Sequence, residues 1–467
     1  MLISLQSLSK LHQQKPNKVL FKEFSKETTV KDFVKRVEAY RLKHHDTKKN
    51  IGLFGNNDIN FAAADCGLSF TENNLVPIPR FFKDDLIKKI ISDAQIDYIY
   101  TDEENFNRIK NLFHNTVNYL QPAQTSFIPV QSGIHRRIIY TSGTTGTPKG
   151  VIQTEQQINF IIKNLTETLS VSEADRYLSI LPISTLLEQI ASIHCVIFNG
   201  AQTIFNPDFS KDIFIKPQNI FSHIHNYKPS MTCLTPLLLE NFINQLDKNL
   251  DLKFLKAITV GGSKTSKEIL IAADRLNLPV YEGYGLSETC SVVSLNCKNT
   301  KRFGSVGKPL PGIEVNIEND EVVVSSPSIM EGYCNSKPHV GKIYTGDIGS
   351  VDSDGFLYIH GRKDDVIALN NGRNVDPNWL ESMISEKIKT NAYSFLNQKG
   401  QHCMVLAVND KALGKQLRNK LKSILPDYAY PEKIYFRNPK EIPKEFFLNI
   451  NGKIDRKKIA EIFLNQQ

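Results

Sequence analysis

The sequence has no long apolar run, few sulfur-containing residues and little excess of either charge. Its 467 residues include seven cysteines, five methionines and one tryptophan. No apolar stretch approaches the roughly 18 residues of a spanning helix, so we expect no membrane span. The amino-terminal residues lack a basic region and a sustained apolar core, which argues against a signal peptide. The cysteines lack CxxC spacing, so we expect reduced, mostly buried thiols in a cytoplasmic protein, without disulfides or zinc.

The overall composition is that of a folded protein with a basic last quarter. Hydrophobic residues make up 40% and charged residues 23%, which excludes a disordered chain. The net charge is +8, and residues 361–467 hold 19 basic and 12 acidic residues. Acidic residues are interleaved there and no basic stripe alternates with aromatics, so we expect no nucleic-acid binding. A polyanionic small molecule, such as ATP or coenzyme A, fits the same positive field.

Short apolar runs alternate with amphipathic stretches along the first 300 residues, which predicts an α/β fold with mostly parallel, helix-covered sheets. Functional loops then lie at the carboxyl ends of strands. Helices are expected at 29–39, 186–199 and 266–276, the second ending before Gly200. Strands are expected at 49–53, 201–205, 254–260 and 278–281.

The pattern changes near residue 300. Period-two alternation at 313–317, 321–325 and 356–359 predicts small antiparallel β structure of barrel type. Beyond Arg362 the chain reads as α+β, with helices at 377–386 and near 411–424. We therefore predict a large core domain over residues 1–362, made of βα-layered sheets and a small β-barrel. A small C-terminal domain follows over residues 363–467.

Residues 138–151 predict a phosphate-binding loop. An apolar strand enters a segment made almost entirely of Gly, Ser and Thr, with one lysine. Glycines let backbone N–H groups approach phosphate oxygens, hydroxyls add donors and the lysine adds charge. The Walker A pattern is absent because the lysine follows a proline and precedes a glycine. The candidate phosphate ligands are Thr141, Ser142, Gly143, Thr144, Thr145 and Lys149.

The stretch 140–151, YTSGTTGTPKGV, resembles the signature of the adenylate-forming superfamily, which comprises acyl-CoA synthetases, nonribosomal peptide adenylation domains and luciferases. Further similar motifs follow in the family's order: YEGYGLSET at 281–289, GSVGKP at 304–309, YTGDI at 344–348, DGFLYIHGR at 354–362 and NGKIDR at 451–456. The resemblance implies activation of a carboxylic acid with ATP and Mg²⁺ to an acyl-adenylate. A thiol then attacks the adenylate.

The resemblance also implies residue roles. Lys453 would bring its ammonium group to the carboxylate and the α-phosphate, which repel each other. Glu288 would hold Mg²⁺, a hard cation that prefers carboxylate oxygen. Asp347 would accept the ribose hydroxyls, and Arg362 would contact ribose or phosphate. Tyr284 would stack on adenine. The other expected nucleotide contacts are Gly262, Gly285 and Ser287, with the neighbouring glycines leaving room for the adenine ring and the acyl chain.

Family members rotate the C-terminal domain between their two half-reactions. The resemblance places the hinge at Asp364 and makes residues 363–467 a mobile lid. Rotation would withdraw Lys453 and bring the loop containing Gly372 and Arg373 to the thiol tunnel. The expected thiol is coenzyme A, with the phosphopantetheine of an acyl carrier protein as the alternative.

The acid is the least defined part of the reaction. The stretch 361–381 looks most like long-chain fatty acyl-CoA ligases, so a fatty acid, and hence fatty acid metabolism, is the first expectation. Thr185 stands where those enzymes commonly have histidine, however. We expect nearby His194 to be a core residue, and His223 and His225 to lie on an element's surface without a metal. The alternatives are an aryl or amino-acid adenylation enzyme, a luciferase-type oxygenase and a non-catalytic nucleotide-binding protein.

Overall fold

The structure is a computed structural model, and its chain divides into two compact units. The first comprises Met1–Val315 and Val324–Ile343, and the second comprises Asn316–Val323 and Tyr344–Gln467. The residues described are 1–45, 47–124, 135–141, 148–213, 216–246, 251–363, 367–368, 374–375, 377–397, 401–408, 414–442, 444–447 and 454–464. The predicted lid boundary after residue 362 stays a prediction.

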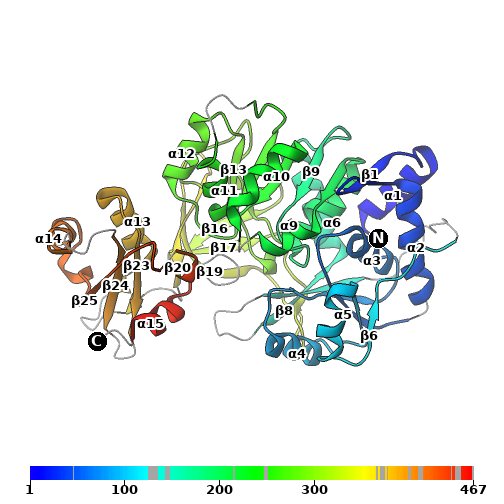
Figure 1. Cartoon of the computed structure of the whole chain (residues 1–467), viewed down its shortest axis with the longest axis horizontal. Coiled ribbons are helices and arrows are strands. Elements are labelled where there is room, and N and C mark those ends of the chain that lie inside the picture. Colours follow the sequence, from blue (N-terminus) through cyan, green and yellow to red (C-terminus); the bar gives the residue numbers. More distant parts are fainter. Residues whose placement is uncertain are drawn as a thin grey trace. The chain divides into compact units, whose positions relative to one another are not determined.

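A nine-stranded sheet runs through the first unit; Figure 1 labels its strands β1, β9 and β13. Its strands in spatial order are β15 (Lys308–Pro309), β14 (Ser294–Leu295), β13 (Val280–Tyr284), β12 (Ala257–Val260), β11 (Met231–Leu234), β9 (Arg176–Ser179), β10 (Gln202–Phe205), β1 (Val19–Glu23) and β2 (Lys26–Thr29). The run from β13 to β1 is parallel. This arrangement confirms the predicted parallel architecture, and it puts the loops after β12 and β13 at one edge.

A seven-stranded sheet carries the candidate phosphate loop. Its order is β18 (Gly332–Tyr333), β8 (Lys149–Thr154), β7 (Arg136–Thr141), β4 (Asn74–Pro77), β3 (Asn50–Phe54), β5 (Tyr98–Thr101) and β6 (Thr116–Asn118). The pairings among β7, β4, β3, β5 and β6 are parallel, and β8 runs antiparallel to β7 and to β18.

Helices cover both sheets. In the first unit they are α1 (Ile3–Gln14), α2 (Val30–His44), α3 (Ile59–Leu68), α4 (Asp84–Asp93), α5 (Glu103–Lys110), α6 (Glu155–Thr168), α7 (Leu186–Gln189), α8 (Val196–Asn199), α9 (Pro207–Asp212), α10 (Ile220–Tyr227), α11 (Pro236–Ile243) and α12 (Lys267–Arg275). Short 3-10 turns cover Pro217–Asn219 and Ser287–Thr289. Apolar residues of α9 to α12 pack on β9 to β13 in a single core. No helix among the described residues has the length and apolarity that crossing a membrane requires.

The predicted helix over 186–199 differs from expectation in its middle. It consists of α7, a π-helix over Ile190–Cys195 and α8. It does end at Gly200, which has a φ of 63°, a conformation that glycine adopts without strain. The π turn is not predicted from the sequence, because the stretch is mostly apolar and one inserted residue in a helical turn leaves no recognisable pattern.

The second unit contains most of a four-stranded sheet, in the order β16 (Glu314–Glu318), β17 (Glu321–Ser325), β19 (Ile343–Val351) and β20 (Leu357–Arg362). Beyond it lie β21 (Ile367–Ala368), β22 (Asn374–Val375), α13 (Pro377–Ile388), β23 (Ala392–Leu396), β24 (His402–Ala407), α14 (Gly414–Ile424), β25 (Lys433–Arg437) and α15 (Arg456–Leu464). Further 3-10 turns cover Asp427–Ala429 and Lys444–Phe447. The predicted α/β class, with a smaller α+β C-terminal part, is confirmed.

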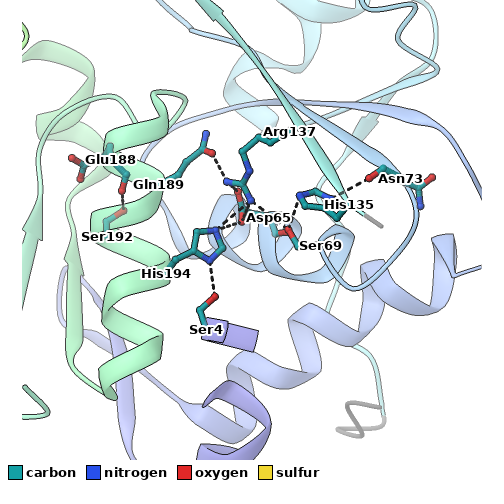
Figure 2. Close-up of polar contacts among 10 residues, drawn as sticks. All are labelled: Ser4, Asp65, Ser69, Asn73, His135, Arg137, Glu188, Gln189, Ser192 and His194. Atoms are coloured by element: carbon teal, nitrogen blue, oxygen red, sulfur yellow. Dashed lines mark hydrogen bonds and ion pairs between the residues drawn. The ribbon is translucent and has the colours of Figure 1, made fainter. Parts of the chain in front are cut away.

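A fully buried ion pair joins α3 to β7 of the seven-stranded sheet (Figure 2). Arg137 on β7 donates to both carboxylate oxygens of Asp65 on α3, at 2.8 and 3.0 Å, and both side chains have zero exposure. Arg137 also donates to the amide oxygen of Gln189 on α7. His194 of the π-helix lies 3.1 Å from Asp65 and 3.0 Å from Ser4 on α1, so the prediction that it is a core residue is confirmed.

Two buried carboxyls of this region have opposite charge states. Burial by itself would raise the pKa of Asp65, but Arg137 and His194 lower it to about 2. Burial raises the pKa of Glu188 to about 8. The hydrogen bonds that its carboxylate accepts from Ser179 and Tyr177 lower the pKa only partly, and no cation among the described residues adds to them. At neutral pH Asp65 is therefore ionised, and Glu188 is largely protonated.

We predict that Asp65→Asn lowers the free energy of unfolding by about 3–5 kcal/mol, because it leaves the guanidinium of Arg137 buried without a counter-charge. Urea unfolding measures the change. Asp84→Asn is the matched control, since Asp84 pairs with Arg108 at 2.8 Å on the surface, and we expect it to cost less than about 1 kcal/mol. Equal losses in the two variants would contradict the prediction.

We predict that Glu188→Gln changes how stability depends on pH. The folded-state pKa of Glu188, about 8, lies above its ordinary value of 4.5, so its contribution is fully present below pH 4.5 and is lost as the pH rises through 8. Glutamine does not titrate, so the stability of the variant relative to the natural chain should rise between pH 5 and pH 8. Unfolding free energies measured at several pH values would disprove this if the two curves ran parallel.

Candidate active site

The candidate phosphate loop lies in the sequence between two strands that pair with each other, β7 and β8. Strands β7 and β8 pair antiparallel up to Tyr140 opposite Gly150 and Thr141 opposite Lys149. The hydroxyl of Tyr140 donates to Asp93 on α4 at 2.5 Å, which anchors one strand end. The hairpin thus fixes the positions where the loop leaves and rejoins the sheet. Thr141 and Lys149 lie at these positions, whereas Ser142, Gly143, Thr144 and Thr145 lie outside the described residues.

Lys149 and Glu288 meet at one aromatic side chain. The ammonium nitrogen of Lys149 lies over the ring of Tyr333, 5.5 Å from its centre. The hydroxyl of Tyr333 donates to Oε1 of Glu288 at 3.0 Å. Two residues that the sequence places 139 positions apart are therefore neighbours of the same half-buried ring, and a cation and a carboxylate converge at the base of the phosphate loop.

The backbone around Glu288 is held by the same hairpin. Ser287 and Glu288 belong to the 3-10 turn after β13. The carbonyl of Ser287 accepts from Nε2 of the buried Gln153 on β8 at 2.6 Å, and the carbonyl of Glu288 accepts from the N–H of Met330 at 2.8 Å. Sequence reasoning placed Glu288 and Ser287 at the site but missed Gln153 and Tyr333, which lie outside the recognised motifs.

Glu288 has the chemistry of a magnesium ligand. Among the described residues its Oε1 accepts from Tyr333, whereas Oε2 makes no hydrogen bond. A carboxylate oxygen that none of the described residues occupies, on a half-buried side chain, suits a hard divalent cation. The described residues contain no group of three or more His, Cys, Asp and Glu that would hold a metal by itself, so a cation here would need oxygens from a phosphate or water as well.

Two glycines of the candidate nucleotide site, Gly285 and Gly262, have different structural constraints. A Cβ on Gly285 would lie 2.0 Å from the carbonyl oxygen of Ser291, so close backbone approach requires glycine there. Gly262 follows β12 with a φ of 84°, and a Cβ there would meet no atom of the described residues within 4 Å. Tyr284, the last residue of β13, directly precedes Gly285 and is half-buried. The open space therefore lies at Gly262, whereas the chain itself fills the space at Gly285.

The candidate ribose ligands form a pair within the second unit. Asp347 on β19 stands directly opposite Arg362 on β20 in the antiparallel register. Their side chains approach to 3.7 Å, and Nη2 of Arg362 donates to the carbonyl of Thr345 at 3.4 Å. The Asp347 side chain is only 10% exposed, whereas that of Arg362 is 39% exposed. The structure thus brings together two residues that the motifs at 344–348 and 354–362 supplied separately.

The remaining predicted site residues lie outside the described residues: Lys453, Asp364, Gly372 and Arg373. His223 stacks on Phe209, with ring centres 3.7 Å apart, and it also contacts Asn206. All seven cysteines are free, and five of them are buried, as the sequence predicted.

Known proteins resemble this chain in sequence and in fold. A family model described as AMP-binding enzyme matches residues 9–334. The 2-succinylbenzoate–CoA ligase of Lactococcus lactis subsp. lactis is 26% identical, over 89% of this chain and 91% of the relative. The ligase of the same name from Staphylococcus epidermidis is 27% identical, over 90% and 89%. Among solved structures, o-succinylbenzoate coenzyme A synthetase from Bacillus subtilis, in complex with ATP and magnesium ion, has a TM-score of 0.81 at 22% identity, covering 97% and 98%.

These comparisons confirm the resemblance to adenylate-forming enzymes and correct its finer part. The expected similarity to long-chain fatty acyl-CoA ligases, and with it fatty acid metabolism, is not supported, because the relatives are named for an aromatic acid. The expectation rested on residues 361–381, a stretch at the start of the predicted lid. Acid specificity depends on how side chains pack around the acyl group, which a short motif elsewhere does not report.

We predict that Gly285→Ala is more destabilising than Gly262→Ala. Gly285→Ala forces backbone apart and should cost about 3 kcal/mol or more. Gly262→Ala meets only the strain of a positive φ, about 1–2 kcal/mol. Thermal or urea unfolding measures both. A Gly262→Ala loss as large as that of Gly285→Ala would show that the space described at Gly262 is filled.

Proposed function

Since the chain belongs to the AMP-binding enzyme family, we propose that it is an acid–thiol ligase of the AMP-forming type. It joins a carboxylic acid to ATP, releases pyrophosphate and transfers the acyl group from the adenylate to coenzyme A. The chemical difficulty is that an anionic carboxylate has to approach an anionic α-phosphate. The protein's part is to bind and orient both groups and to supply positive charge where the negative charges meet.

One observation carries this proposal. The ammonium group of Lys149, at the end of the phosphate loop, and the carboxylate of Glu288 both contact Tyr333. A phosphate-binding cation beside a carboxylate whose second oxygen has no hydrogen bond among the described residues is the arrangement that a metal–phosphate group needs. Magnesium bound there would neutralise phosphate charge. Lys149 would orient the phosphates, and Glu288 would keep them in one place.

We propose an aromatic carboxylic acid, such as 2-succinylbenzoate, as the substrate, and coenzyme A as the acceptor. The relatives that align over about nine-tenths of the chain are named for that acid and that thiol. Thr185, at the start of α7, also differs from the histidine expected of long-chain enzymes, and its hydroxyl donates to the carbonyl of Pro182 at 2.8 Å. An acyl carrier protein remains the alternative acceptor, because its phosphopantetheine arm presents the same thiol.

The residues of the lid complete the proposal. Lys453 would bridge the carboxylate and the α-phosphate, and residues 363–467 would rotate about Asp364 so that Gly372 and Arg373 reach the thiol. Asp347 and Arg362 would bind the ribose, with Tyr284 against the adenine. The remaining phosphate-loop residues, Gly262, Gly285 and Ser287 would complete the nucleotide site.

The experiment is ATP–pyrophosphate exchange with a panel of acids, followed by thioester formation with coenzyme A or an acyl carrier protein. We expect exchange with aromatic acids, 2-succinylbenzoate among them, to exceed exchange with fatty acids by at least about tenfold. Thioester formation should favour coenzyme A. Exchange with no acid of any class would contradict the ligase assignment, and a preference for fatty acids would contradict only the substrate class.

We predict that Lys453→Ala slows adenylation by about 100-fold or more while ATP binding is retained, since the lysine acts on charge that develops during the reaction. The matched control is Lys457→Ala, which removes an exposed lysine at the start of α15 and should leave adenylation unchanged. Single-turnover formation of the adenylate measures the rate. Equal rates in the two variants would show that the reaction does not use Lys453.

A further inference from the structure

Tyr333 is held by its backbone against the phosphate hairpin. Strand β18 pairs antiparallel with β8, with Tyr333 opposite Val151 and Gly332 opposite Ile152. The next residue, Cys334, donates its N–H to the carbonyl of Gly150 at 2.7 Å. These bonds fix Tyr333 two positions along β8 from Lys149.

The segment that carries Tyr333 has two further anchors. Glu331 makes a two-point ion pair with Arg136 on β7, at 2.7 and 2.8 Å. The buried side chain of Met330 packs with Val151 and Ile343. Its backbone N–H donates to the carbonyl of Glu288. The backbone that carries Tyr333 is therefore tied both to the hairpin and to the 3-10 turn of Glu288.

The two ends of the Tyr333 side chain meet opposite charges. The hydroxyl, a donor at neutral pH, holds one oxygen of Glu288 and leaves the other without a hydrogen bond among the described residues. The face of the ring, which is electron-rich, lies under the ammonium of Lys149. A direct ion pair between Lys149 and Glu288, both of them described residues, would use up both charges. The structure has no ion pair between these two side chains. Each of them contacts Tyr333 instead.

We propose that Tyr333 is a positioning residue for the metal–phosphate part of the site. Its hydroxyl fixes the Glu288 carboxylate for a divalent cation, and its ring keeps Lys149 available for phosphate. This inference rests on the proposed function and deepens it. Removing a residue that hydrogen-bonds to a metal ligand typically lowers metal affinity or activity by about 10–100-fold.

The test is calorimetric titration of the full-length protein with ATP, once in Mg²⁺ and once in EDTA. The gain in ATP affinity from Mg²⁺ reports the Glu288 side of the site, and affinity in EDTA reports the rest. Tyr333→Phe keeps the ring and removes the hydroxyl, so we expect the Mg²⁺-dependent gain to fall about tenfold while affinity in EDTA stays unchanged. Unchanged affinity in EDTA also shows that the variant's nucleotide site is folded.

Two further variants serve as a control and as a test of the contact between the Tyr333 ring and Lys149. Tyr358→Phe is the matched control, because Tyr358 donates to Asp352 at the same 3.0 Å in a different sheet; both affinities should equal those of the natural chain. Tyr333→Ala also removes the ring, so affinity in EDTA should fall as well, by roughly two- to fivefold.

A double-mutant cycle with Glu288→Gln tests whether Tyr333 acts through Glu288. In a chain that already carries Glu288→Gln, adding Tyr333→Phe should cause no further loss of the Mg²⁺-dependent gain. The proposal is overturned if Tyr333→Phe keeps the full Mg²⁺-dependent gain in ATP affinity, or if it lowers the affinities in Mg²⁺ and in EDTA equally. It is also overturned if Tyr333→Phe reduces that gain by the same factor in the Glu288→Gln chain as in the natural chain. Failure of the proposed function is distinguishable, since it would appear as ATP binding by the natural chain without exchange on any acid.

Discussion

The buried contact between Arg137 and Asp65 is the constraint on which the rest of the first unit depends. A guanidinium with zero exposure is costly unless an opposite charge lies beside it. Asp65 supplies the charge from α3 and Gln189 supplies a further acceptor from α7. These contacts together set how the strand entering the phosphate loop sits relative to α3 and α7. Exchanging the pair for apolar groups would lose this specification, even where it preserved stability.

Backbone hydrogen bonds connect β7, the strand that carries Arg137, to the candidate site. Strand β7 fixes β8 by a continuous antiparallel ladder, and β8 fixes Gly332 and Tyr333 by another. The 3-10 turn of Glu288 is then held by Gln153 of β8 and by Met330. The residues that gather at the base of the phosphate loop therefore sit on paired strands and a short anchored turn. Such a foundation suits a site in which charges have to stay in place while a reaction proceeds.

The comparison of sequence and structure is most informative at the site. The motifs located Lys149, Glu288, Asp347 and Arg362, because chemistry requires those residue types in recognisable surroundings. They did not locate Tyr333 or Gln153. Tyr333 follows a glycine in a segment without any phosphate-binding or metal-binding pattern, and its role depends on antiparallel pairing with a strand about 180 residues earlier. Gln153 occupies a strand position like any other, and only its contact with Ser287 distinguishes it.

The sequence by itself determined the class of fold and most of the helix and strand positions, because hydrophobic periodicity, capping residues such as Thr29 and glycine-rich turns act over a few neighbouring residues. The family came from the resemblance of its motifs, which are short stretches of contiguous residues. It did not determine the π turn within the apolar helix or the reason for Gly285. Nor did it determine the charge states of Asp65 and Glu188, or the meeting of Lys149 and Glu288 at Tyr333. Each of these depends on atoms that are distant along the chain, and only packing in three dimensions brings such atoms within the few ångströms over which sterics, hydrogen bonds and charges act.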